Sequence, residues 1–122
     1  MTIPSLVDAQ RRSAATYPDH AAIVFNGRTT THRAFDEASD RVATGLAAAG
    51  IAPGDRVGLY AVNSDAFAIT YFGILKAGAT VVPINLLLNP KEVAYNLNDA
   101  GVRAVIYSDP MGTPMKEVRT LL

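Results

Sequence analysis

Two carboxylates at helical spacing are the first candidates for chemistry in this sequence. Asp36 and Asp40 stand four residues apart, so on a helix their side chains would share one face. Paired carboxylates can serve as general acid and general base when their surroundings push the two pKa values apart. The face that carries Asp36 and Asp40 is polar, and the other acidic residues are dispersed along the chain. We therefore predict a solvated helix face and not a catalytic pair.

The sequence offers few residues that could bind a metal ion or act as a nucleophile. The sequence has no cysteine, which excludes disulfides, thiolate catalysis and zinc–cysteine sites. His20 and His32 lack the four-residue spacing of a metal-binding pair on a helix, and we expect two surface histidines. The phosphate-binding patterns G-x-x-x-x-G-K-[ST] and G-x-G-x-x-G are absent, as are G-x-S-x-G and H-E-x-x-H.

Four tyrosines lie in segments that read as strands or apolar helices: Tyr60, Tyr71, Tyr95 and Tyr107. Packing in the core or at an interface, with the hydroxyl at the boundary, is the expected role of such tyrosines. We accordingly assign no catalytic, cofactor-binding or metal-binding residue to this sequence.

Helices and strands alternate along the chain. The expected elements are a helix at 6–16, strands at 21–25 and 28–31, a helix from 32 to the glycine at 50, a strand at 57–61, a helix at 65–77, a strand at 80–84, a helix from 90 to the glycine at 101, a strand at 104–107 and a helix from 113 onward. Ser5 and Asp8 form a capping-box-like start for the first helix. Asn26-Gly27 predicts a tight hairpin turn between the first two strands, and Thr31 can cap the second helix.

From Arg56 onward the alternation is typical of βαβ units, which form a parallel sheet. The continuous apolar run at 57–61 suits a strand covered on both faces. The helix at 65–77 is apolar nearly all round, which predicts burial on several sides, and Gly73 within it suggests close backbone packing. Pro83 lacks an N–H group, so its strand must end there or lie at an edge. We predict an α/β fold with a parallel sheet flanked by helices, preceded by a helix and a β-hairpin.

Composition narrows the class of protein. The chain has 122 residues, enough for one domain, and 49% of them are hydrophobic, which excludes a disordered chain. Eleven basic and eleven acidic residues cancel, so the charge pattern does not suggest a nucleic-acid binder. Only 18% of the residues are charged, which hints that some surface meets more protein. No segment is long and apolar enough to span a bilayer, and we expect a cytoplasmic location.

One string of residues rises above composition. It reads LKAGATVVPIN at 75–85 and is followed by P-x-E-V-A-Y-x-L-N-D at 90–99. This resembles the N-terminal part of the adenylate-forming, AMP-binding enzymes, above all the acyl-CoA synthetases. The segments G-I-x-P-G-D-R-V at 50–57, P-D-x-A at 18–21 and T-T-H-R-A-F at 30–35 are also similar to the family's pattern, although the last has histidine and phenylalanine where the family usually has tyrosine and leucine.

The resemblance implies an activity for an intact parent enzyme. Such an enzyme forms an acyl-adenylate from ATP and a carboxylic acid, with Mg²⁺, and then transfers the acyl group to coenzyme A. The family's phosphate loop, ribose-binding aspartate and catalytic lysine come later in sequence than this chain. We therefore expect residues 1–122 to be an N-terminal subdomain without a second domain, to bind no cofactor and to be inactive alone.

One loop is the nearest candidate for a ligand contact. Some family members have Asn-Pro-Arg after the strand that ends in V-P-(I/L)-N, with a basic side chain able to face the nucleotide of coenzyme A. Here the stretch is Asn85-Leu86-Leu87-Leu88, and leucine cannot pair with a phosphate. Lys91 is close by in sequence, but we expect it on a solvated helix turn.

Several alternatives remain open at this point. The chain could begin a carrier-protein-charging adenylation domain or a luciferase-like enzyme, although Asn85 leans toward the CoA ligases. It could also be a short non-catalytic binding module on the same scaffold. The expected partner is the remainder of the parent enzyme. The low charge content and the apolar third helix further predict self-association through exposed apolar surface.

Overall fold

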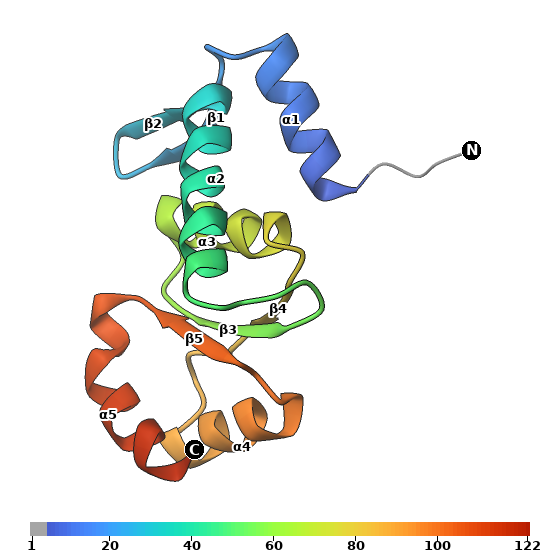
Figure 1. The fold of residues 1–122 in the computed structure, drawn as a ribbon. Helices are drawn as coiled ribbons and strands as arrows, with labels where there is room; N and C mark the ends of the chain where they lie inside the picture. The colour runs from blue at the N-terminus through green and yellow to red at the C-terminus, as the bar shows by residue number, and fades with distance from the viewer. Residues whose placement is uncertain (1–4) are drawn as a thin grey trace.

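A computed structural model describes residues 5–122, which form an α/β fold (Figure 1). In chain order the elements are α1 (Leu6–Thr16), β1 (Ala21–Phe25), β2 (Arg28–Thr31), α2 (His32–Ala48), β3 (Arg56–Tyr60), α3 (Asp65–Lys76), β4 (Thr80–Pro83), α4 (Pro90–Ala100), β5 (Ala104–Tyr107), a 3-10 turn η1 (Asp109–Met111) and α5 (Gly112–Leu121). Every predicted helix and strand is present, with bounds that differ by a residue or two at some ends.

Local signals place the elements of the N-terminal half. Ser5 and Asp8 form the predicted capping box at the start of α1. Asn26 and Gly27, at φ values of 50° and 76°, make the tight turn between the antiparallel strands β1 and β2. Thr31 caps α2 by accepting a hydrogen bond from the N–H of Ala34 at 3.1 Å. Each of these features uses residues a few positions apart, which is why the sequence predicts them well.

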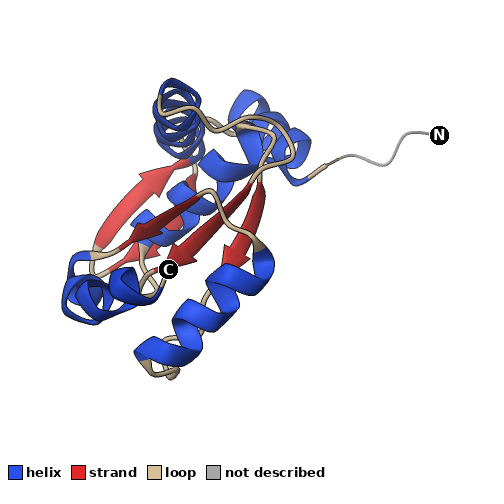
Figure 2. Ribbon diagram, turned by 60° about the horizontal axis from the view of Figure 1, so that its bottom comes forward, coloured by secondary structure: helices blue, strands red, loops and turns tan. Residues whose placement is uncertain are grey.

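The second half of the chain builds the predicted parallel sheet. Its strand order is β4-β3-β5, and both pairings are parallel. Helices α2 and α3 cover one face of this sheet and α4 and α5 cover the other, as Figures 1 and 2 show. β3 is the central strand, and its residues from Val57 to Tyr60 are all buried. The continuous apolar run therefore does lie between two layers.

Two apolar clusters fill the spaces between the layers. The cluster on the α2 and α3 side contains Leu46, Val57, Leu59, Ile74 and Ala79. The cluster on the α4 and α5 side contains Tyr60, Ile84, Val93, Ala94, Leu97, Met115 and Val118. Alternate residues of β3 supply both clusters, because successive side chains of a strand point to opposite faces.

The helix α3 corrects one expectation. Only Gly73 and Ile74 are fully buried in it, whereas most of its other apolar residues are half-buried. The helix packs on α2 and the sheet and makes smaller contacts with α1 and β1, which leave most of its apolar side chains partly exposed. Gly73 confirms the close packing that was expected of it. A Cβ built there would lie 2.4 Å from Cβ of Val42, so the two helices meet backbone to side chain at this point.

Candidate functional site

The loops that follow the parallel strands form the first candidate site. Asn63 follows β3, Asn85 follows β4 and Ser108 follows β5, so all three lie at the carboxyl edge of the sheet. The connection from β3 runs to α3 on one face, and the connection from β4 runs to α4 on the other face. In open α/β sheets, ligands bind in the crevice where neighbouring connections diverge in this way. Here that point lies between β3 and β4.

The polar side chains of this edge already accept hydrogen bonds from backbone N–H groups of the loops. Ser108 accepts a hydrogen bond from the N–H of Val62 at 3.1 Å, and the side chain of Asn85 accepts one from the N–H of Leu87 at 2.9 Å. These bonds fix the loops after β3 and β4. The groups are neutral amides and a hydroxyl, which can position a ligand but cannot balance the charge of a triphosphate.

The N-termini of α3 and α4 also point to this edge, but caps occupy their donors. Ser64 accepts from the N–H of Phe67 at 3.2 Å. Asn89 accepts from the N–H of Glu92 at 3.0 Å, and Glu92 returns a bond to the N–H of Asn89. Acidic residues in both first turns further reduce the attraction of these helix ends for an anion.

The loop that matched the family's basic contact is exposed and apolar. Leu87 is 92% exposed, and Lys91 is exposed on the first turn of α4, as expected of a solvated lysine. No cationic side chain is contributed by Asn85-Leu86-Leu87-Leu88.

The cap of α4 gives a direct prediction. Asn89→Ala should lower the free energy of unfolding by about 1 kcal/mol, because it leaves the N–H of Glu92 without its acceptor and breaks the capping box. Urea unfolding followed by circular dichroism would measure the change. Asn96→Ala, at an exposed position within the same helix, serves as the control and should not lower stability.

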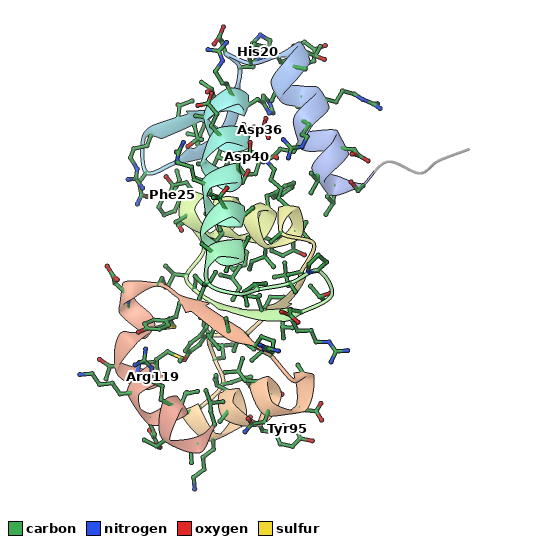
Figure 3. All side chains as sticks on the ribbon, viewed as in Figure 1. His20, Phe25, Asp36, Asp40, Tyr95 and Arg119 are labelled. Atoms are coloured by element: carbon green, nitrogen blue, oxygen red, sulfur yellow. The ribbon has the colours of Figure 1, made fainter. Side chains whose placement is uncertain are left out.

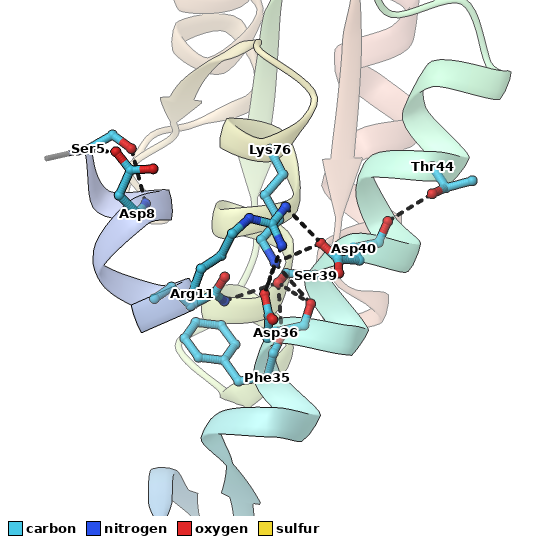
Figure 4. A network of polar contacts seen from close by, with 10 residues as sticks. Ser5, Asp8, Arg11, Phe35, Asp36, Ser39, Asp40, Thr44 and Lys76 are labelled. Carbon is cyan, nitrogen blue, oxygen red and sulfur yellow. Dashed lines mark hydrogen bonds and ion pairs between the residues drawn. The ribbon is translucent and has the colours of Figure 1, made fainter. Parts of the chain in front are cut away.

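A second polar centre lies between α1, α2 and α3 and was not predicted (Figure 4). The side chain of Lys76 is only 2% exposed, and its ammonium donates to the carboxylates of Asp36 at 2.5 Å and Asp40 at 2.9 Å. It also donates to the backbone carbonyl of Asp36 at 2.9 Å. The guanidinium of Arg11, from α1, bridges the same two carboxylates at 3.4 and 3.3 Å.

This centre corrects the interpretation of Asp36 and Asp40 as a solvated face. Two cations balance two carboxylates, all three donors of the lysine are satisfied, and the group joins three helices. Next to it, the side chain of Gln10 donates to the hydroxyl of Ser39 at 3.1 Å, and both residues are buried. A lysine held by two ionised carboxylates is neither a free base nor a free nucleophile, so this arrangement is a structural one.

The ion pairs make the attachment of α1 to α2 and α3 dependent on pH. The hydrogen bond from Lys76 holds the pKa of Asp40 below its ordinary value, with further lowering by Arg11. A lowered folded-state pKa stabilises the fold fully above the unfolded value of about 3.9, and this stabilisation is lost as pH falls through the folded pKa. Asp40→Asn should therefore cost up to about 1 kcal/mol at pH 7, since Asp40 is half-exposed, and almost nothing at pH 2. Urea unfolding of the unchanged protein and of Asp40→Asn at several pH values would show whether their free energies of unfolding become equal at low pH.

The remaining candidates are surface or packing residues. His20 is exposed (Figure 3) and stacks on Tyr17 at a ring distance of 5.1 Å. His32 is half-buried at the start of α2. Among residues 5–122, no three histidine, aspartate or glutamate side chains lie close enough together to hold a metal ion.

The four tyrosines differ in how deeply they are buried. Tyr60 is buried, as predicted, and Tyr71 and Tyr107 are half-buried. Tyr95 is 68% exposed and so does not pack in the core, because it lies on the face of α4 that points away from the sheet (Figure 3). Across the part of the chain that the structure describes, no helix has the length and apolar character that a membrane crossing requires.

Comparison with known proteins identifies the scaffold. Residues 10–121 match the family described as AMP-binding enzyme. The chain is 34% identical over 116 residues to a fatty acid–[acyl-carrier-protein] ligase, ScoC, of Streptomyces coeruleorubidus, covering 95% of this chain and 22% of that protein. It is 40% identical over 103 residues to the long-chain-fatty-acid–CoA ligase of Escherichia coli O157:H7, covering 84% of this chain and 18% of that protein.

A solved structure agrees with these relatives. The N-terminal domain of FACL13 from Mycobacterium tuberculosis superposes with a TM-score of 0.90 at 34% identity, over 96% of this chain and 30% of that one. The chain thus spans about a fifth of the length of the curated relatives it matches. Because the family match covers almost the whole sequence and the fold agrees with it, this chain belongs to the AMP-binding enzyme family.

Proposed function

We propose that this chain is the N-terminal scaffold of an ATP-dependent ligase that joins a carboxylic acid, fatty or aryl, to coenzyme A. The observation that carries the proposal is its 40% identity, over 103 residues, to a long-chain-fatty-acid–CoA ligase. The parent would form an acyl-adenylate and pyrophosphate from ATP and the acid, and then a thioester as the thiol of coenzyme A displaces AMP. The contribution of this chain is a parallel sheet and two helical layers against which later segments can pack.

The residues present do not fit the sites of ATP, Mg²⁺ or coenzyme A. The carboxyl edge of the sheet offers neutral side chains, such as those of Ser108 and Asn85, which already accept hydrogen bonds from the backbone N–H groups of Val62 and Leu87. The one buried ammonium in the Asp36–Asp40 cluster, that of Lys76, is used up between helices. We therefore assign no step of the reaction to this chain and expect it to be inactive alone.

A chimera tests the proposal. The segment of the Escherichia coli long-chain-fatty-acid–CoA ligase that aligns with this chain would be replaced by residues 10–121, and acyl-CoA formation from a long-chain acid would be measured. We expect activity above that of the same ligase with the segment deleted. A chimera that folds and binds ATP but forms no acyl-adenylate would contradict the scaffold role.

The isolated chain provides the complementary measurement. Acid-dependent ATP–pyrophosphate exchange should stay at background for the 122-residue chain over a range of fatty and aryl acids. Exchange above background would mean that the chain holds a complete adenylation site, and the proposal of an inactive scaffold would then be wrong.

The relative from Streptomyces coeruleorubidus favours a second candidate. Its name describes a ligase that charges an acyl-carrier protein instead of coenzyme A. In the chimera, offering both acceptors would reveal whether this segment influences the choice. We expect the acceptor of the host ligase to be retained, because no side chain at the carboxyl edge is placed to select a thiol.

A further inference from the structure

Helix α1 is attached to the rest of the chain by few buried groups. Of its eleven residues only Gln10 is buried, whereas α4, a helix of the same length, buries three apolar residues. The side chain of Gln10 donates to Ser39, but its own carbonyl oxygen, Oε1, is buried without a hydrogen-bond partner among the described residues. This unpaired acceptor offsets much of what the hydrogen bond contributes, because water would satisfy the oxygen if α1 moved away.

The apolar contacts of α1 are incomplete. Two clefts, of about 370 and 210 Å³, lie where α1 meets its neighbouring helices, and Leu6 lines both of them. Leu6 is itself exposed, and Val7 and Ala14 are half-buried. Closely packed helices leave no clefts of this size between them, so the apolar surface of α1 contributes less to its attachment than that of α4.

The ion pairs of Arg11 are the main remaining contact, and they cover Lys76. The guanidinium of Arg11 binds Oδ1 of Asp36 and Oδ1 of Asp40. The ammonium of Lys76 binds the same two oxygen atoms, so the two cations lie side by side (Figure 4). Of these four residues, Arg11 alone comes from α1. Its side chain is exposed, so dissolved salt screens its ion pairs.

The chain has a hinge directly after α1. The carbonyls of Pro18 and His20 accept hydrogen bonds from the first two N–H groups of α2, at 3.1 and 3.0 Å. Tyr17 precedes these anchors, is exposed, and has a backbone conformation outside the helical region. A rotation of the backbone at Tyr17 would therefore move α1 as a unit while the residues from Pro18 onward keep their bonds to α2.

We propose that α1 is a hinged cover, which opens about Tyr17 without unfolding of the sheet, and that each opening uncovers the amine of Lys76 as a site for acylation. Helices with few buried apolar contacts are the ones that open locally. In the open state Asp36 and Asp40 still bind the ammonium, but water reaches it, so the lysine can release its proton and attack an activated acyl group. The inference rests on contacts within this chain and does not depend on the proposed ligase function.

Lysine acetylation, followed residue by residue with mass spectrometry, tests the cover. The probe is N-hydroxysuccinimidyl acetate, whose acetyl group passes to the neutral amine while N-hydroxysuccinimide leaves and the proton goes to water. Arg11→Ala should raise the rate at Lys76 about threefold or more, because both ion pairs of α1 are lost. Added NaCl should raise this rate in the unchanged chain and have little effect in Arg11→Ala.

Two controls separate the cover from general effects. Arg12→Ala makes the same change at the next, also exposed position of α1 and should leave the rate at Lys76 unchanged. Lys91, exposed on α4, should react at the same rate in every variant and corrects for changes in the reagent.

Amide hydrogen exchange locates the motion independently. The amides of α1 should exchange faster in Arg11→Ala by a similar factor, whereas those of α4 should keep their rates, which also shows that the variant is folded. Equal protection of α1 and α4 in the unchanged chain overturns the proposal, because α1 would then open only with the whole fold. So does a rate at Lys76 that neither salt nor Arg11→Ala changes, because α1 would then not control access to the amine.

Discussion

Gly73→Ala should lower the free energy of unfolding by about 1–2 kcal/mol, although alanine is the better helix former. The new Cβ would lie 2.4 Å from both Cβ and Cγ1 of Val42 and 3.1 Å from the carbonyl oxygen of Ser39. Backbone and a β-branched side chain cannot move aside separately, so α2 and α3 must separate. Overpacking of this kind typically costs 1–3 kcal/mol, and it outweighs the gain of about 1 kcal/mol in helix propensity.

Gly45, on the helix that faces Gly73, supplies the control. A Cβ at Gly45 meets nothing within 4 Å, and the residue is exposed. Gly45→Ala should therefore stabilise the protein by about 0.5–1 kcal/mol, the usual effect of replacing glycine in a helix interior. Urea unfolding of both variants would give changes of opposite sign. Two stabilising changes would mean that α2 and α3 do not approach as closely as the structure has them.

Val42 allows the origin of the penalty to be tested. In a Val42→Ala background the Cγ1 contact is gone while the Cβ contact remains, so the cost of Gly73→Ala should shrink without vanishing. The coupling between the two changes should then be measurable in a double-mutant cycle, since the residues are in direct contact. Equal costs in both backgrounds would place the strain elsewhere.

The elements of this fold could be predicted because their signals are local or periodic. The turn at Asn26-Gly27, the cap at Ser5 and the stop at Gly50 each depend on a few adjacent residues. The parallel pairing of the strands follows from the alternation of strands and helices alone. Gly73 predicted a close approach of another helix, because a glycine in an apolar helix has few other uses. Which strand lies at the centre did not follow from the sequence pattern, except that Pro83 placed β4 at an edge.

Two errors have different physical origins. For Tyr95 packing in the core or at an interface was expected, and the core alternative is wrong. Tyr95 is two positions from both Val93 and Leu97, which are buried, and a two-residue step turns a helix by about 200°. Period alone would have placed Tyr95 in solvent. The ion pairs of Lys76, in contrast, join it to Asp40, 36 positions away in the sequence, and to Asp36, 40 positions away. Only the packing of α3 on α2 brings these residues together.

The family assignment came from another kind of signal. An ordered string such as LKAGATVVPIN is informative as a whole, whereas each residue in it has a local structural use. Gly78, for example, adopts a φ of 77° at the end of α3 and packs closely against Pro53. The polar centre around Lys76 could not be predicted from this string, because the partners of Lys76 lie far away in the sequence.

Lys76→Met should lower the free energy of unfolding by about 2 kcal/mol, the second large effect that the structure predicts. Methionine keeps most of the length of the side chain but removes the charge, so Asp36 and Asp40 face each other with Arg11 as their remaining counter-ion. Breaking a buried ion pair by removing one partner costs about 3–5 kcal/mol. The loss is smaller here because the side chains of Asp36 and Asp40 are 21% and 47% exposed, so water solvates part of the uncovered charge.

Lys91→Met is the matched control, because Lys91 is an exposed lysine in a helix, and its effect should stay within about 0.5 kcal/mol. Adding Asp40→Asn to Lys76→Met should recover part of the loss, since it removes one of the two unbalanced carboxylates. The recovery should be larger at pH 7 than at pH 3, where the carboxylate of Asp40 begins to be protonated in any case. If Lys76→Met proves as mild as Lys91→Met, the ammonium is not the group that holds α1, α2 and α3 together, and the apolar contacts of these helices must suffice.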